Sequence, residues 1–185
     1  MKSSQISQSA NSQLVLIDLQ ERLAAVMQPE AMQQVLKHCS ILLQAAKLLE
    51  IPQIYTEQYP KGLGATCAGL LPQLTEHQRV EKTAFSCCDE PTFCRKLTGD
   101  RPQVVLAGME AHICILQTAL ALQAQGRQVF VAADAVISRN PEYKANALQR
   151  LCTAGVIVSN TESIVFEWLG RAEGDVFKQI SKLVR

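Results

Sequence analysis

Three side chains of this sequence have the types that activate and use a nucleophile: the carboxylate of Asp18, the amine of Lys82 and the thiol of Cys114. A cysteine thiol near its free pKa is mostly protonated at pH 7 and must lose that proton before it attacks. A carboxylate within hydrogen-bond reach accepts such a proton, and a buried lysine beside it favours the thiolate. If the fold brings the three together, they predict nucleophilic catalysis by Cys114.

Each of the three also has a structural interpretation when it is taken alone. Asp18 could cap a helical segment that starts at Leu19. Lys82 could be a surface residue at the end of a strand, and Cys114 could be a small core residue. Only their joint placement at strand ends favours the catalytic interpretation.

The stretch 103–126 is the clearest strand–turn–helix pattern in the chain. A short apolar run at 104–106 is typical of a strand buried on both faces, and the helical period that follows stops at Gly126. Cys114 then lies just beyond the carboxyl end of a strand and in the first turn of a helix. Open α/β sheets bind their ligands at this place, and the helix macrodipole there favours a thiolate.

Short apolar runs alternate with amphipathic helical segments along the chain. We expect strands over 14–17, 53–56, 78–82, 104–106, 128–132 and 156–158. We expect helices over 29–50, 89–98, 115–125, 140–154, 160–169 and 175–183. This alternation predicts an α/β fold: a three-layer α/β/α sandwich with a mainly parallel sheet of about six strands.

Length and composition favour one globular domain. The chain has 185 residues, of which 48% are hydrophobic and 19% charged, and we expect a flexible tail over 1–12 and one folded domain over 13–185. The net charge of +1 without a basic run favours a small-molecule substrate over nucleic acid or a membrane surface. No apolar stretch approaches the roughly 18 residues of a spanning helix, and the polar N-terminus lacks a signal-peptide core, so we expect a cytoplasmic protein.

The cysteines and histidines show no metal-binding pattern. Seven cysteines is an odd number, and in a reducing cytosol we expect free thiols. The three histidines lack zinc spacing, so we expect no metal and no cofactor. We expect core packing for Cys39 and Cys152, whereas the cysteines in or near loops that could approach a pocket are Cys67, Cys87, Cys88 and Cys94.

Three motifs, in order, carry a family resemblance: VLIDLQ at 15–20, EKTAFS at 81–86 and AGMEAHICILQTA at 107–119. On these motifs the chain resembles the isochorismatase-like cysteine hydrolases, in particular the branch of isochorismatase domain-containing and YcaC-type hydrolases. The resemblance implies Asp18 as general base, Lys82 as electrostatic partner and Cys114 as nucleophile. It further implies a cis peptide bond between Met109 and Glu110, and an oxyanion hole made by the backbone N–H groups of Glu110 and Cys114.

Two departures from better-known members narrow the chemistry. True isochorismatases resemble this chain around GMEAHI but have a glycine at the place of Cys114, so the cysteine indicates acyl transfer from an amide or related C–N bond through a thioester. The segment 56–67 has no histidine where nicotinamidases of the family bind a metal. Two alternatives remain: a non-catalytic binding or scaffold protein, and a redox-responsive thiol protein that retains the fold.

Further residues are candidates for the surroundings of the site. We expect Gln58, Tyr59 and Phe85 to line the substrate pocket, and Gln20 to orient a loop. His112 is either a second proton carrier or a capping or packing residue. Family members commonly form homo-oligomers, and the segments that could serve as interface or as core are Trp168, Leu169 and the final helix.

Overall fold

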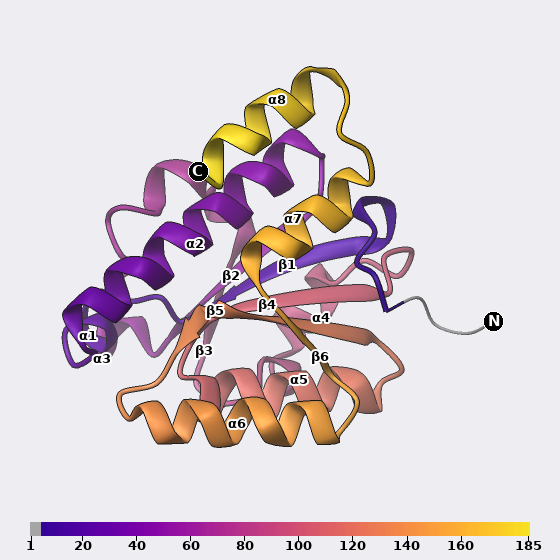
Figure 1. The fold of residues 1–185 in the computed structure, drawn as a ribbon. Coiled ribbons are helices and arrows are strands. Elements are labelled where there is room, and N and C mark those ends of the chain that lie inside the picture. Colours follow the sequence, from indigo (N-terminus) through magenta and orange to yellow (C-terminus); the bar gives the residue numbers. More distant parts are fainter. Residues whose placement is uncertain (1–4) are drawn as a thin grey trace.

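A six-stranded parallel sheet forms the centre of the computed structural model, which describes residues 5–185 (Figure 1). The strands are β1 (Ser12–Ile17), β2 (Gln53–Gln58), β3 (Arg79–Lys82), β4 (Gln103–Met109), β5 (Gln128–Ile137) and β6 (Ile157–Ser159). Every neighbouring pair is parallel, in the order β3-β2-β1-β4-β5-β6. The predicted fold class is confirmed.

Helices cover both faces of this sheet (Figure 1). They are α1 (Glu21–Ala24), α2 (Pro29–Leu48), α3 (Pro60–Leu63), α4 (Pro91–Lys96), α5 (Leu116–Ala124), α6 (Pro141–Thr153), α7 (Thr161–Leu169) and α8 (Gly174–Leu183). One hydrophobic core joins α2, α7 and α8 to one face of the sheet, and a second core joins α4, α5 and α6 to the other. In β1 the residues alternate between them: Leu14 and Leu16 enter the first core, Val15 and Ile17 the second.

The strand order places a topological switch point between β1 and β4. The chain leaves β1 for β2 on one side, and leaves β4 for β5 on the other. At such a point the connections diverge and open a crevice at the carboxyl ends of the strands. Asp18 follows β1 and Cys114 follows β4, so both lie at this crevice.

Local structure differs from the sequence prediction in four places. The short helices α1 and α3 were not expected, and the segment Ala111–Ile115 forms a π-helical turn ahead of α5. Strand β5 continues to Ile137, past a register irregularity opposite β4, so Asp134 lies inside β5 and not beyond it. There its Oδ1 accepts the backbone N–H of Thr161 at 2.8 Å, at the start of α7.

The N-terminal segment contacts the C-terminal half of the chain. Ser7 is fully buried, and Trp168 Nε1 donates to Ser7 Oγ at 2.8 Å and to Ser12 Oγ at 3.1 Å. Trp168 is 3% exposed, which makes it a core residue. The flexible tail over 1–12 stays a prediction, and its first four residues lie outside the described part of the chain.

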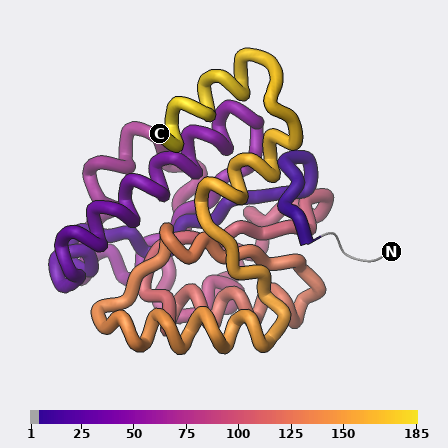
Figure 2. The backbone as a smooth tube through the Cα atoms, viewed as in Figure 1, coloured from indigo at the N-terminus to yellow at the C-terminus, as the bar shows by residue number. Residues whose placement is uncertain are grey.

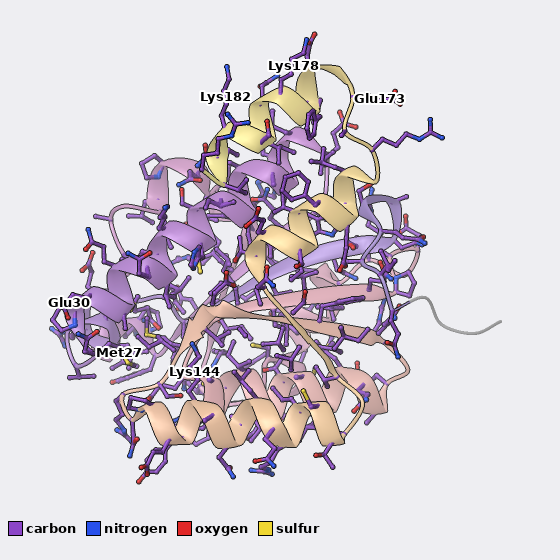
Figure 3. The ribbon with its side chains drawn as sticks, viewed as in Figure 1. Met27, Glu30, Lys144, Glu173, Lys178 and Lys182 are labelled. Carbon is purple, nitrogen blue, oxygen red and sulfur yellow. The ribbon has the colours of Figure 1, made fainter. Side chains whose placement is uncertain are left out.

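The last helix, α8, is amphipathic and lies beside α2 (Figure 2). Ile180 is fully buried against the core, whereas the labelled side chains of Lys178 and Lys182 point away from the sheet (Figure 3). Within residues 5–185, no helix combines the length and apolar character needed to cross a membrane.

Gly108 permits the close approach of β4 to β1. It has φ +122°, and a Cβ atom there would lie 2.0 Å from the Ile17 carbonyl oxygen. We predict that Gly108→Ala lowers the free energy of unfolding by more than the roughly 1–3 kcal/mol of a strained backbone alone, because the clash adds to it. Urea denaturation measures the change. Gly99→Ala is the matched control, because no atom lies within 4 Å of its added Cβ, and an equal effect of both substitutions would contradict this account.

Candidate active site

Hydrogen bonds with Thr56 of β2 hold the Asp18 carboxylate in place. Asp18 is 1% exposed with φ 53°, its backbone N–H donates to Thr56 O at 3.1 Å, and its Oδ1 accepts from Thr56 Oγ1 at 2.6 Å. Asp18 does not cap a helix, because α1 begins only at Glu21 and Gln20 occupies the capping position. The side chain is therefore free to face the carboxyl edge of the sheet.

The ammonium group of Lys82 lies at the centre of the site. Lys82 ends β3, and its side chain is completely buried. Its Nζ atom contacts Asp18 Oδ2 at 2.8 Å, Gln58 Oε1 at 2.5 Å, Ala84 O at 3.1 Å, Phe85 O at 3.4 Å and Cys114 Sγ at 3.5 Å. Burial by itself lowers the pKa of Lys82, but the charge of Asp18 and the Cys114 thiol outweigh it and raise the pKa. Lys82 is therefore positively charged at neutral pH.

Cys114 reaches the same point from β4. It sits in the π-helical turn Ala111–Ile115, is 7% exposed, and belongs to the core that also holds Val80 of β3 and Cys87. The structure therefore brings together the three side chains that the sequence singled out, from the ends of three different strands.

Burial opposes the thiolate form of Cys114, whereas the helix N-terminus nearby favours it. Burial raises its pKa to about 12, and the negative charge of Asp18 adds to the rise, while Lys82 opposes it. A hydrogen bond with Asp18 also raises this pKa. Removing the thiol from water thus outweighs both the helix dipole and the nearby cation, so any attack by Cys114 needs a base at that moment.

The predicted pocket residues lie around the triad in different ways. Tyr59 and Phe85 are 56% and 55% exposed. Tyr59 lines a cavity of about 250 Å³ together with Lys82 and Glu90, whereas Phe85 does not line it. Gln58 has both ends of its amide engaged within the protein: Oε1 accepts from Lys82 Nζ, and Nε2 donates to Thr83 O at 2.7 Å.

The residues before Cys114 connect to the β5–α6 loop. The Met109–Glu110 peptide bond is cis, as the resemblance implies, and Glu110 Oε2 accepts the backbone N–H of Arg139 at 2.9 Å. His112 Nδ1 lies 2.9 Å from Ser138 Oγ, and its ring packs on Tyr143 with centroids 5.1 Å apart. These contacts favour the packing role for His112.

Two supporting residues complete the site. Gln20 was expected to orient a loop, and it does: its amide accepts from Gln58 N at 2.8 Å and donates to Gln58 O at 3.0 Å and Gly64 O at 2.6 Å. Thr56, which holds Asp18, was missed. The signal was available, because a hydroxyl at the end of one parallel strand lies beside the end of its neighbour.

The remaining thiols are free, and none joins a metal cluster. Among residues 5–185, no three His, Cys, Asp or Glu side chains are grouped so that they could hold a metal ion. Cys39 is a core residue, whereas Cys152 is exposed, which corrects its expected core packing. The buried residues of α6 are Ala147 and Leu151, and Cys152 lies on the outward face of this helix.

The protonated thiol leads to a testable titration. We predict that the absorbance at 240 nm of the wild type, after subtraction of that of Cys114→Ser, shows no thiolate from pH 6 to 9. The reason is that the pKa of the Cys114 thiol is raised to about 12. Asp18→Asn removes a charge that raises this pKa, so thiolate should appear at lower pH, whereas Lys82→Met should not produce it. Substantial thiolate in the wild type at pH 7–8 would contradict the assignment.

Comparison with known proteins identifies the family. Residues 12–163 match the isochorismatase domain. Isochorismatase domain-containing protein 2 from Danio rerio is 41% identical over 177 residues, which cover 94% of this chain and 86% of that protein.

Solved structures share the whole fold. A Caenorhabditis elegans protein described as MAR1 ribonuclease superposes with a TM-score of 0.88 at 36% identity, over 96% of this chain and 91% of that one. The YcaC gene product of Escherichia coli is described as an octameric hydrolase of unknown specificity. It superposes with a TM-score of 0.88 at 20% identity, over 99% of this chain and 91% of that one. The match over residues 12–163 and the 41% identical relative show that the chain belongs to the isochorismatase domain family and has the fold of its hydrolases.

Proposed function

We propose that this protein is a cysteine-dependent hydrolase of a small amide or related acyl substrate, acting through Asp18, Lys82 and Cys114. One observation carries the proposal: Lys82 Nζ lies 2.8 Å from Asp18 Oδ2 and 3.5 Å from Cys114 Sγ, in a buried site at the switch point of the sheet. Nucleophile, base and counter-charge are thus within reach of one reacting carbon.

In the first half of the reaction, Asp18 takes the proton of the Cys114 thiol while Sγ attacks the carbonyl carbon. A C–S bond forms, and the carbonyl electron pair moves onto oxygen, where the backbone N–H groups of Glu110 and Cys114 stabilise it. When this intermediate collapses, the C–N bond breaks. The protonated Asp18 gives its proton to the leaving amine.

In the second half, water hydrolyses the thioester. Asp18 takes a proton from the water, whose oxygen attacks the acyl carbon, and the C–S bond then breaks. The proton returns to the Cys114 sulfur, which releases the carboxylic acid and restores the resting thiol. Because Lys82 has a raised pKa, it contributes charge throughout and does not act as the proton carrier.

Tyr59 and Phe85 are proposed to contact the substrate. Tyr59 and Phe85 present exposed aromatic surface beside the buried triad, which suits a ligand with an apolar part. Gln58 is proposed to act from behind the pocket wall, because its amide is already bonded to Lys82 and Thr83.

The burial of Cys114 favours this function over a redox-responsive one. Redox-sensing cysteines have a low pKa and are accessible to solvent, whereas Cys114 is 7% exposed with a pKa raised to about 12. A scaffold without turnover would have no need for a base beside a buried thiol.

We further propose a cytoplasmic homo-oligomer. The related octamer supports assembly, and exposed apolar side chains such as Val26 and Phe166 offer contact surface. Light scattering of the purified protein is expected to give a mass that is a multiple of 20.3 kDa. A monomer at micromolar concentration would overturn this proposal.

Substrate trapping tests the chemistry. On incubation with a panel of small amides and esters, we expect mass spectrometry to find an acyl adduct on Cys114 and none on Cys114→Ser. Asp18→Asn is expected to slow turnover by about 10²–10⁴-fold, the usual contribution of a general base. Lys82→Met should slow it as well, because the charge that balances Asp18 is lost.

The panel includes RNA, because a 36% identical protein is described as a ribonuclease. RNA cleavage that survives Cys114→Ser, without any acyl adduct in the panel, would overturn the proposed hydrolase. Sulfenate on Cys114 without an adduct would support the redox alternative instead.

A further inference from the structure

The segment that follows Lys82 holds its ammonium group in place. Nζ donates to the carbonyl oxygens of Ala84 at 3.1 Å and Phe85 at 3.4 Å. Thr83 and the Phe85 side chain are exposed, so this segment lies at the surface. Carbonyl groups on a surface segment keep a fixed direction only if their peptide planes are anchored.

Glu90 anchors one end of a peptide plane in this segment. Its Oε1 accepts the backbone N–H of Thr83 at 2.8 Å and that of Ala84 at 3.1 Å. These two bonds lower the pKa of Glu90, so the carboxylate is charged at neutral pH. Glu90 immediately precedes α4, whose Phe93 is fully buried, and this connects the carboxylate to the core.

Gln58 anchors the other end of the same plane. The C=O of Thr83 and the N–H of Ala84 belong to one peptide unit; Gln58 Nε2 donates to the C=O at 2.7 Å, and Glu90 accepts from the N–H. The other end of the Gln58 amide accepts directly from Lys82 Nζ. Gln20 in turn binds both backbone groups of Gln58.

We propose that Gln58 and Glu90 form a positioning clamp, which grips the peptide unit between Thr83 and Ala84 and so fixes the Lys82 ammonium between Asp18 and Cys114. A lysine ammonium is a point charge on a flexible stem, so its location depends on its acceptors. Its effect on the sulfur depends on the 3.5 Å separation that the clamp maintains. The functional consequence of the clamp rests on the proposed role of Lys82.

The location of the ammonium can be observed directly. In ¹H–¹⁵N spectra of lysine NH₃⁺ groups, a fully buried and hydrogen-bonded Lys82 gives a protected signal, which Lys82→Met assigns by its loss. We expect Glu90→Ala and Gln58→Met to broaden this signal through faster exchange. We also expect them to slow alkylation of Cys114 by iodoacetamide at pH 7.5 by about fivefold, the effect of roughly one lost hydrogen bond.

Two variants distinguish positioning from general stability. Glu90→Gln keeps an amide oxygen that can accept both N–H groups, so it should keep the signal and most of the alkylation rate. Asp89→Asn changes a neighbouring exposed carboxylate and should leave both readouts as in the wild type. Thermal denaturation shows which variants are folded. If Glu90→Ala is unfolded, Gln58→Met alone is compared with Asp89→Asn and the wild type.

The proposal is overturned if folded Glu90→Ala and Gln58→Met both match Asp89→Asn in signal and rate. A different result would contradict the proposed role of Lys82 and leave the clamp standing. In that case Lys82→Met would not change the rate of Cys114 alkylation, whereas Glu90→Ala and Gln58→Met would still broaden the lysine signal.

Discussion

The contact between Asp18 and Lys82 is the interaction on which the rest of the site depends. Both side chains are buried, with Lys82 Nζ 2.8 Å from Asp18 Oδ2. Removing either partner of a buried pair leaves an uncompensated charge, at a typical cost of about 3–5 kcal/mol. The surrounding polar groups reduce the desolvation penalty: Thr56 bonds Asp18, and Gln58 with two carbonyl groups bonds Lys82.

This ion pair also sets the resting state of the sulfur. A carboxylate and a cation beside one thiol act in opposite directions on its pKa, and burial then decides the sign, so Cys114 stays protonated. In the proposed reaction, Cys114 becomes a nucleophile only when its proton moves to Asp18. Such a thiol is oxidised and alkylated more slowly than an exposed thiolate, which fits the proposed acyl transfer better than redox sensing.

The sheet brings these groups together because its order reverses between β1 and β4. Asp18 and Cys114 follow the adjacent strands β1 and β4, and Lys82 ends the edge strand β3, which is two places from β1 and three from β4. Its long side chain spans that distance to reach both. Gly108 allows the backbones of β1 and β4 to approach where a side chain would collide with Ile17. The arrangement of the site therefore depends on the order of the strands and on the absence of a side chain at Gly108.

The sequence by itself determined the fold class and the identity of the three central residues, because apolar runs, helical periods and strand ends are local patterns that burial in a parallel sheet requires. It also indicated Gln20 as a loop-orienting residue. It did not reveal the π-helical turn around Cys114, the full length of β5, or the contacts of Thr56 and Glu90, because these depend on how the folded segments pack. It also did not reveal that burial raises the pKa of Cys114. A helix dipole can be inferred from local sequence, but desolvation depends on how completely the folded protein excludes water, and only the tertiary structure decides that.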